Sequence, residues 1–102
     1  GLFDLLHVGH VRYLDGARAA GSSLLVAINS DESARRLKGT GRPLVALDER
    51  LELVAALESV DWVTWFDEDT VELLLRRLRP SIHAKGTDYT EIRFQSVLWR
   101  AN

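Results

Sequence analysis

The most constraining feature of this sequence is an apolar run that does not alternate, Leu24-Leu25-Val26-Ala27-Ile28. A strand with one face in water alternates apolar and polar residues, whereas a strand covered on both faces needs no alternation. Sheets that are covered on both faces are typically parallel, with helices packed on either side. The run therefore predicts a buried strand in a parallel sheet.

Helical and strand patterns alternate along the rest of the chain. The expected helices span 11–20, 31–37, 47–55 and 71–78, and the expected strands span 24–28, 61–66 and 82–84. Asp69 and Glu72, three residues apart, resemble a capping box for the last helix. Each strand is separated from the next by enough chain for a right-handed crossover. We therefore predict an α/β fold, a doubly wound parallel sheet in three α/β/α layers.

The first ten residues, Gly1-Leu2-Phe3-Asp4-Leu5-Leu6-His7-Val8-Gly9-His10, indicate a strand end, a turn and a helix start. His7 and His10 would share one face of the first turn, beside N–H groups that lack intrahelical partners. The helix dipole is positive at that end. Gly9 carries no Cβ, so an anion could approach the backbone while both imidazoles donate to it. This segment predicts a phosphate-binding site at the carboxyl edge of the sheet.

Two other interpretations of the histidine pair stay open. The pair could be half of a zinc site, but the chain has no cysteine and only one further histidine, so carboxylates would have to complete it. The histidines could also be structural residues that are satisfied at a helix end without any ligand.

Composition limits the classes of function. The chain has 102 residues, which is the size of one domain, and we treat 1–102 as a single domain. A net charge of −2 argues against a broad nucleic-acid surface, and no apolar run is long enough to cross a membrane. The absence of cysteine excludes disulfides and thiol catalysis within this sequence and fits a reducing compartment. We expect a cytoplasmic protein with no nucleic-acid or membrane partner.

Phosphate chemistry would therefore depend on a few local cations. Lys38 and Arg42 belong to a glycine-rich loop that could close over a triphosphate. Arg50 lies in a helix first turn, where a cation is electrostatically unfavourable. The alternative for all three is an ordinary solvated basic residue, and Arg50 could simply balance the neighbouring acids.

The H-x-G-H pattern, with Gly-x-Phe-Asp-Leu-Leu before it and an amphipathic helix after it, resembles the signature of the cytidylyltransferase-type nucleotidyltransferases. Those proteins have a Rossmann-like fold and join a nucleotide to a phosphorylated small molecule, releasing pyrophosphate. Later segments resemble the adenylyltransferase half of ADP-heptose synthases, in order and at similar spacing. The matching segments are Asn29-Ser30-Asp31, Leu37-Lys38-Gly39, Arg42-Pro43, Glu49-Arg50, Val60-Asp61, Glu68-Asp69-Thr70 and Lys85-Gly86-Thr87-Asp88-Tyr89.

The resemblance implies roles for these residues. His7 and His10 would be the catalytic phosphate-binding pair, and Lys38 and Arg50 the cations of the transition state. Asp4 would lie near the phosphates and any Mg²⁺, which the family requires. The remaining nucleotide- and phosphate-binding residues implied by the resemblance are Phe3, Gly9, Arg42 and Asp88.

The implied reaction transfers AMP from ATP to a sugar 1-phosphate, such as a heptose phosphate. The alternatives are a cytidylyltransferase that uses CTP and glycerol 3-phosphate, and a nucleotide-binding or interaction module without turnover. The resemblance also suggests a homodimer and a sugar kinase that is fused to the chain or works with it. The chain begins at the last residues of the family's first strand and lacks the late Ser/Thr-rich segment, so we expect an incomplete domain at both ends.

Overall fold

The computed structural model describes residues 1–86 and 92–94. Its elements follow one another as α1 (Val8–Ala19), β1 (Leu25–Asn29), α2 (Asp31–Lys38), α3 (Leu47–Ala55), β2 (Trp62–Phe66), α4 (Glu72–Leu78), β3 (Ala84–Gly86) and β4 (Ile92–Phe94). The first five elements agree with the sequence prediction to within a few residues.

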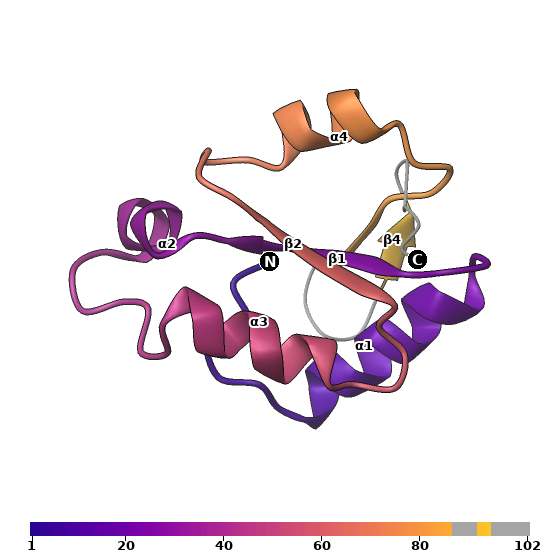
Figure 1. The fold of residues 1–102 in the computed structure, drawn as a ribbon, viewed down its shortest axis with the longest axis horizontal. Helices are drawn as coiled ribbons and strands as arrows, with labels where there is room; N and C mark the ends of the chain where they lie inside the picture. The colour runs from indigo at the N-terminus through magenta and orange to yellow at the C-terminus, as the bar shows by residue number, and fades with distance from the viewer. Residues whose placement is uncertain (87–91, 95–102) are drawn as a thin grey trace.

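Strands β1 and β2 pair in parallel, with Leu25 opposite Trp62 and Asn29 opposite Phe66. Helices α1 and α3 lie on one side of this pair and α4 lies on the other (Figure 1). The chain between the two strands crosses over through α2 and α3, as parallel pairing requires. The α/β class with parallel strands is thus confirmed.

The opening residues lie along β1 at its carboxyl end. The N–H of Asn29 donates to the carbonyl of Gly1 at 3.0 Å, and the amino group of Gly1 donates to the carbonyl of Ala27 at 2.9 Å. These bonds place the residues that follow, up to His7, beyond the carboxyl edge of the sheet, where ligands of α/β proteins bind.

The core lies on the α1 and α3 side of the strand pair. Alternate side chains of β1, Val26 and Ile28, are buried against Leu14 of α1 and Val54 of α3. On the opposite face of β1, Leu25 and Ala27 are only half-buried, whereas the polar residue Asn29 is buried. The expectation that this strand is covered on both faces is therefore met fully on the α1 and α3 side and in part on the other.

The third predicted strand is wrong in its bounds and its partner. Strand β3 starts at Ala84 and pairs with β4 in an antiparallel arrangement, so it does not extend the β1–β2 pair. A three-residue apolar run carries too little periodicity to determine either property from sequence.

The predicted capping box at α4 is also wrong. The N-cap of this helix is Val71, which makes no side-chain capping bond, and the carboxylate of Asp69 accepts from Nε of Arg36 at 2.8 Å instead. The predicted apolar stripe is half-buried at Leu74 and Leu75, and Leu78 is 44% exposed. An ion pair with α2 thus outcompetes the local cap.

Within the described residues, the helices are all too short or too polar to cross a bilayer.

Candidate functional site

The histidine pair forms the start of α1. His7 has extended backbone angles and is the N-cap, while Gly9 and His10 lie within the first helical turn. The Nδ1 atom of His7 accepts from the N–H of Gly9 at 3.0 Å, and the Nδ1 atom of His10 accepts from the N–H of His7 at 3.2 Å. The two side chains thus form a capping box, in which each imidazole accepts a backbone N–H, and the ring centroids are 4.1 Å apart. The helix begins three residues earlier than predicted because His7 serves as its cap.

These hydrogen bonds assign a tautomer to each ring. Because both Nδ1 atoms accept backbone N–H groups, the proton of each neutral imidazole is on Nε2. Each Nε2–H is then a donor on the opposite side of the ring from the helix backbone. Two such donors, 3 positions apart at a helix N-terminus, suit the oxygens of a phosphate.

His10 is held neutral by its surroundings. Burial lowers the pKa of His10 most strongly, and the neighbouring His7 lowers the pKa further. The ring of Phe3 contributes to this burial, since its centroid is 5.2 Å from that of His10. His10 thus donates from a neutral ring near pH 7, and an anion bound there would favour its protonation.

The carboxylate of Asp4 joins the opening segment, residues 1–10, to the α2–α3 loop, residues 39–46. It accepts from Nε of Arg42 at 2.7 Å, from the N–H of Leu44 at 2.8 Å and from the N–H of Val45 at 2.9 Å. Burial by itself would raise the pKa of Asp4, but the bonds from the two amides and from Arg42 outweigh it and lower the pKa. Asp4 is therefore ionised, and its hydrogen bonds connect the opening segment to the α2–α3 loop.

The surroundings of Asp4 do not suit a magnesium ion. Its side chain is 4% exposed, and its oxygens already accept from Arg42 and two backbone amides. Across residues 1–86 and 92–94, no three His, Asp or Glu side chains come together in a metal-binding group. The described part of the chain thus contains no group of protein ligands for the Mg²⁺ that was expected near Asp4.

Arg50, which the resemblance implied as a cation of the transition state and for which a solvated residue was the alternative, is wholly buried. Its guanidinium donates to the carbonyls of Val45, Leu2 and Asn29, each at 2.8 Å, and to the carboxylate of Asp31 at 2.7 Å. A first-turn position is tolerable for this cation because four protein oxygens, one of them from a carboxylate, accept its hydrogen bonds.

Lys38 is the last residue of α2 and is exposed. Within the described part of the chain it forms none of the ion pairs, so its ammonium is available to an anion. Arg42 is brought beside the opening segment by Asp4. Asp88 lies outside the described residues.

Sequence reasoning missed a polar cluster that anchors α2. The hydroxyl of Ser33 accepts from Nδ2 of Asn29 at 3.0 Å and donates to the carbonyl of Glu68 at 2.8 Å. The spacing of four between Asn29 and Ser33 was the available signal, but the partner at Glu68 is distant in sequence.

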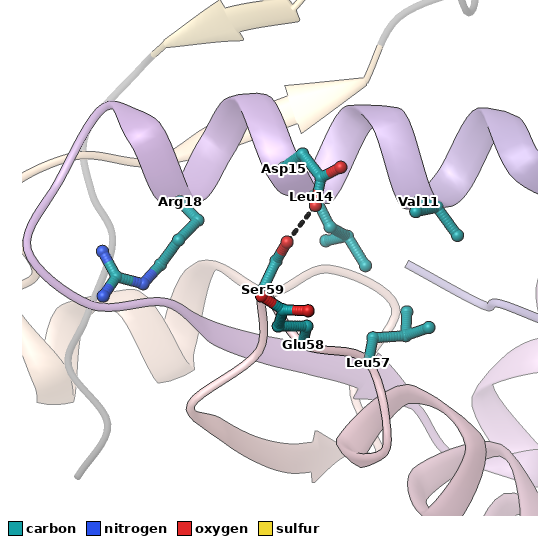
Figure 2. Close-up of a pocket in the computed structure, with 7 residues that line it drawn as sticks. All are labelled: Val11, Leu14, Asp15, Arg18, Leu57, Glu58 and Ser59. Carbon is teal, nitrogen blue, oxygen red and sulfur yellow. Dashed lines mark hydrogen bonds between the residues drawn. The ribbon is translucent and has the colours of Figure 1, made fainter.

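A hollow of about 460 Å³ lies between α1 and the segment that follows α3, away from the predicted site residues. Figure 2 shows Asp15 of α1 hydrogen-bonded to Ser59 across it, with Arg18 at one end. Arg18 is paired with Asp61 at 3.1 Å. None of the predicted phosphate-binding residues lines this hollow, so the histidine turn remains the candidate site.

The chain is similar to known proteins over most of its length. Residues 1–100 match the family model described as Cytidylyltransferase-like. The bifunctional protein HldE of Hahella chejuensis is 55% identical over 91 residues, which are 89% of this chain and 19% of that protein. HldE of Methylococcus capsulatus is 54% identical over 92 residues, 90% of this chain and 20% of that protein. The chain thus spans about a fifth of the length of these relatives.

A solved structure has the same fold. The crystal structure of the lipopolysaccharide core biosynthesis protein from Thermoplasma volcanium superposes with a TM-score of 0.68 and 30% identity. The superposition covers 76% of this chain and 62% of that chain.

Proposed function

The chain belongs to the cytidylyltransferase-like family, and from that membership we propose that it provides the active site of a nucleotidyltransferase. The proposed reaction transfers AMP from ATP to a sugar 1-phosphate, with heptose 1-phosphate as the preferred acceptor. An acceptor phosphate oxygen attacks the α-phosphorus, and the bond from that phosphorus to the bridging oxygen breaks. The bonding electrons leave with pyrophosphate.

The observation that carries the proposal is the pair of Nε2–H donors at the start of α1. Both rings are fixed by backbone bonds to Nδ1, and the pKa of His10 is lowered, so the donor of His10 is neutral and oriented before a ligand arrives. Transfer of a nucleotidyl group needs mainly alignment and stabilisation of developing charge. In this proposal His7 and His10 bind the phosphates, and Lys38 approaches the leaving oxygens.

The choice of ATP and a sugar phosphate rests on similarity. The relatives in Hahella and Methylococcus carry the name HldE, and the Thermoplasma structure is named for lipopolysaccharide core biosynthesis. The segments around Lys38 and Arg42 also resemble the adenylyltransferase half of ADP-heptose synthases. Because the HldE proteins are called bifunctional, we further propose that a sugar kinase accompanies this activity, in a cytoplasmic homodimer.

The test is pyrophosphate release. The protein is incubated with Mg²⁺, each of the four nucleoside triphosphates in turn, and a panel that includes heptose 1-phosphate and glycerol 3-phosphate. Release with ATP and heptose 1-phosphate supports the proposal, whereas release only with CTP and glycerol 3-phosphate would identify a cytidylyltransferase. Nucleotide binding without any product would identify a binding module.

His10→Ala should lower the rate of pyrophosphate release by about a hundredfold or more, because it removes a fixed donor to the developing charge. Arg12→Ala, which changes an exposed residue of the same helix, is the matched control and should leave the rate near that of the unaltered protein. Undiminished turnover by a folded His10→Ala variant would contradict the proposed role of His10 as a phosphate-binding donor.

A further inference from the structure

The guanidinium of Arg50 contacts four segments of the chain at once. Its acceptors are the carbonyl of Leu2 in the opening segment, the carbonyl of Asn29 at the end of β1, the carboxylate of Asp31 at the start of α2 and the carbonyl of Val45 before α3. All three guanidinium nitrogens take part, and the residue has no exposed surface. One side chain therefore holds together the strand end and the three segments around it.

This arrangement conflicts with direct contact between Arg50 and a phosphate. The positive charge is already paired with Asp31 at 2.7 Å, and the donors are directed to protein oxygens. To reach a ligand, the guanidinium would have to break several charge-assisted hydrogen bonds and leave carbonyls of buried backbone without partners.

The segments that Arg50 joins are those that carry the proposed ligand-binding groups. Leu2 precedes the histidine turn, and Asp31 begins the helix that ends at Lys38. Val45 is held from both sides, since its N–H donates to Asp4 and its carbonyl accepts from Arg50. A displacement at Arg50 would therefore move the histidines and Lys38 relative to each other.

We infer that Arg50 is a positioning residue, which aligns the histidine turn with α2 and the α2–α3 loop, rather than a cation that touches the reacting phosphates. The inference rests on the proposed nucleotidyl transfer for its kinetic consequence. Its structural consequence does not depend on that function, because the alignment exists without a ligand.

The first experiment uses the unaltered protein. The Nε–H signal of Arg50 is followed by ¹⁵N NMR while ATP is added. A positioning role predicts an Nε–H that exchanges slowly with water and a signal that stays in place when the histidine ring signals shift. If the Arg50 signal moves with those of the histidines and becomes coupled to phosphorus, Arg50 contacts the phosphate and the inference is overturned.

The second experiment compares Arg50→Lys with Arg35→Lys. Lysine keeps the charge but donates from a single nitrogen, so it cannot reach four acceptors that lie around a planar guanidinium. Arg35 is an exposed arginine of α2 that pairs with Glu32, and it is the matched control. Without nucleotide, Arg50→Lys should shift the ring signals of His7 and His10, and Arg35→Lys should not.

With substrates, Arg50→Lys should lower kcat/KM by about tenfold or more, because misalignment of the histidines and Lys38 weakens both phosphate binding and stabilisation of the developing charge. Arg35→Lys should leave kcat/KM near that of the unaltered protein. Unchanged histidine signals in Arg50→Lys would overturn the inference, whether kcat/KM falls or stays the same. A fall in kcat/KM without any shift of the histidine signals would mean that Arg50 acts on the substrates directly.

The proposed nucleotidyl transfer and the positioning role of Arg50 can be rejected independently of each other. If the unaltered protein releases no pyrophosphate, the proposed function is wrong, while the histidine signals of Arg50→Lys still decide the positioning role. If Arg50→Lys does not fold, the titration of the unaltered protein decides it.

Discussion

Asp4 illustrates how a single carboxylate can fix a loop. Burial of an ionised side chain that is only 4% exposed would be costly by itself, and hydrogen bonds from Arg42, Leu44 and Val45 offset that cost. Two of these donors are backbone amides of the α2–α3 loop, so the carboxylate defines the path of the loop as well as its charge balance. Removal of the charge should therefore affect both stability and loop position.

Asp4→Asn should destabilise the protein by about 2 kcal/mol at pH 7. The amide has one acceptor oxygen and an NH₂ group that would face the donors of Arg42, Leu44 or Val45. Urea denaturation of the two proteins measures the difference, and Glu58→Gln, an exposed change of the same kind, is the control.

The effect of Asp4→Asn should depend on pH. Because the folded pKa of Asp4 is lowered, its stabilising contribution is complete above the unfolded pKa, about 3.9 for aspartate, and is lost as pH falls through the folded value. The stability difference between the two proteins should thus shrink below about pH 4. A difference that stays constant from pH 7 to pH 3 would contradict an ionised Asp4.

At the level of single residues, the sequence indicated which groups are unusual but not what they contact. The placement of His7 and His10 at a helix start followed from local spacing, and the structure confirms it. The roles of Asp4 and Arg50 depend on backbone groups far along the chain, such as the amide of Leu44 and the carbonyl of Leu2. The periodicity of a sequence does not predict which main-chain groups a charged side chain will contact.

Helix α2 combines local and distant stabilisation. Ser30 caps it, accepting from the N–H of Ser33, and acids in its first turn and bases in its last turn suit the dipole. Its orientation comes from Ser33, which is fully buried between Asn29 and Glu68. The bounds of α2 could therefore be predicted from sequence, whereas its attachment to the segment after β2 could not.

Ser33→Ala should cost about 1 to 3 kcal/mol of stability, because the amide of Asn29 and the carbonyl of Glu68 would lose a buried partner. Thermal unfolding followed by circular dichroism measures the change. Ser22→Ala, an exposed serine in the turn before β1, serves as the control and should alter stability by a few tenths of a kcal/mol. Equal melting temperatures for Ser33→Ala and the control would show that these bonds do not anchor α2.

At the scale of the whole molecule, the two sides of the β1–β2 pair are unequal. The buried apolar cluster connects α1, β1 and α3, and the residues of α4 are at most half-buried (Figure 1). The alternation of helices and strands was sufficient to predict an α/β fold with parallel strands. The weak packing of α4 could not be predicted, because its apolar spacing resembles that of a buried helix.

This inequality predicts two classes of hydrogen exchange. Amides of β1 and α3 are bonded beside buried side chains such as Ile28 and Val54, so they should exchange only through nearly global unfolding. Amides of α4, including that of Leu75, should exchange through local opening that exposes little apolar surface.

Hydrogen exchange at several low concentrations of urea distinguishes these classes. Opening free energies for β1 and α3 should fall steeply with urea, in parallel with global unfolding, while those for α4 should be smaller and nearly independent of urea. Trp65 and Leu73 are both exposed, so they would contact solvent whether α4 is closed or locally opened. They would therefore add little to the urea dependence of the opening free energy. A steep urea dependence in α4 that matches that of β1 would mean that both sides of the strand pair unfold as one unit. The apolar residues of α4 would then contribute more to stability than their burial indicates.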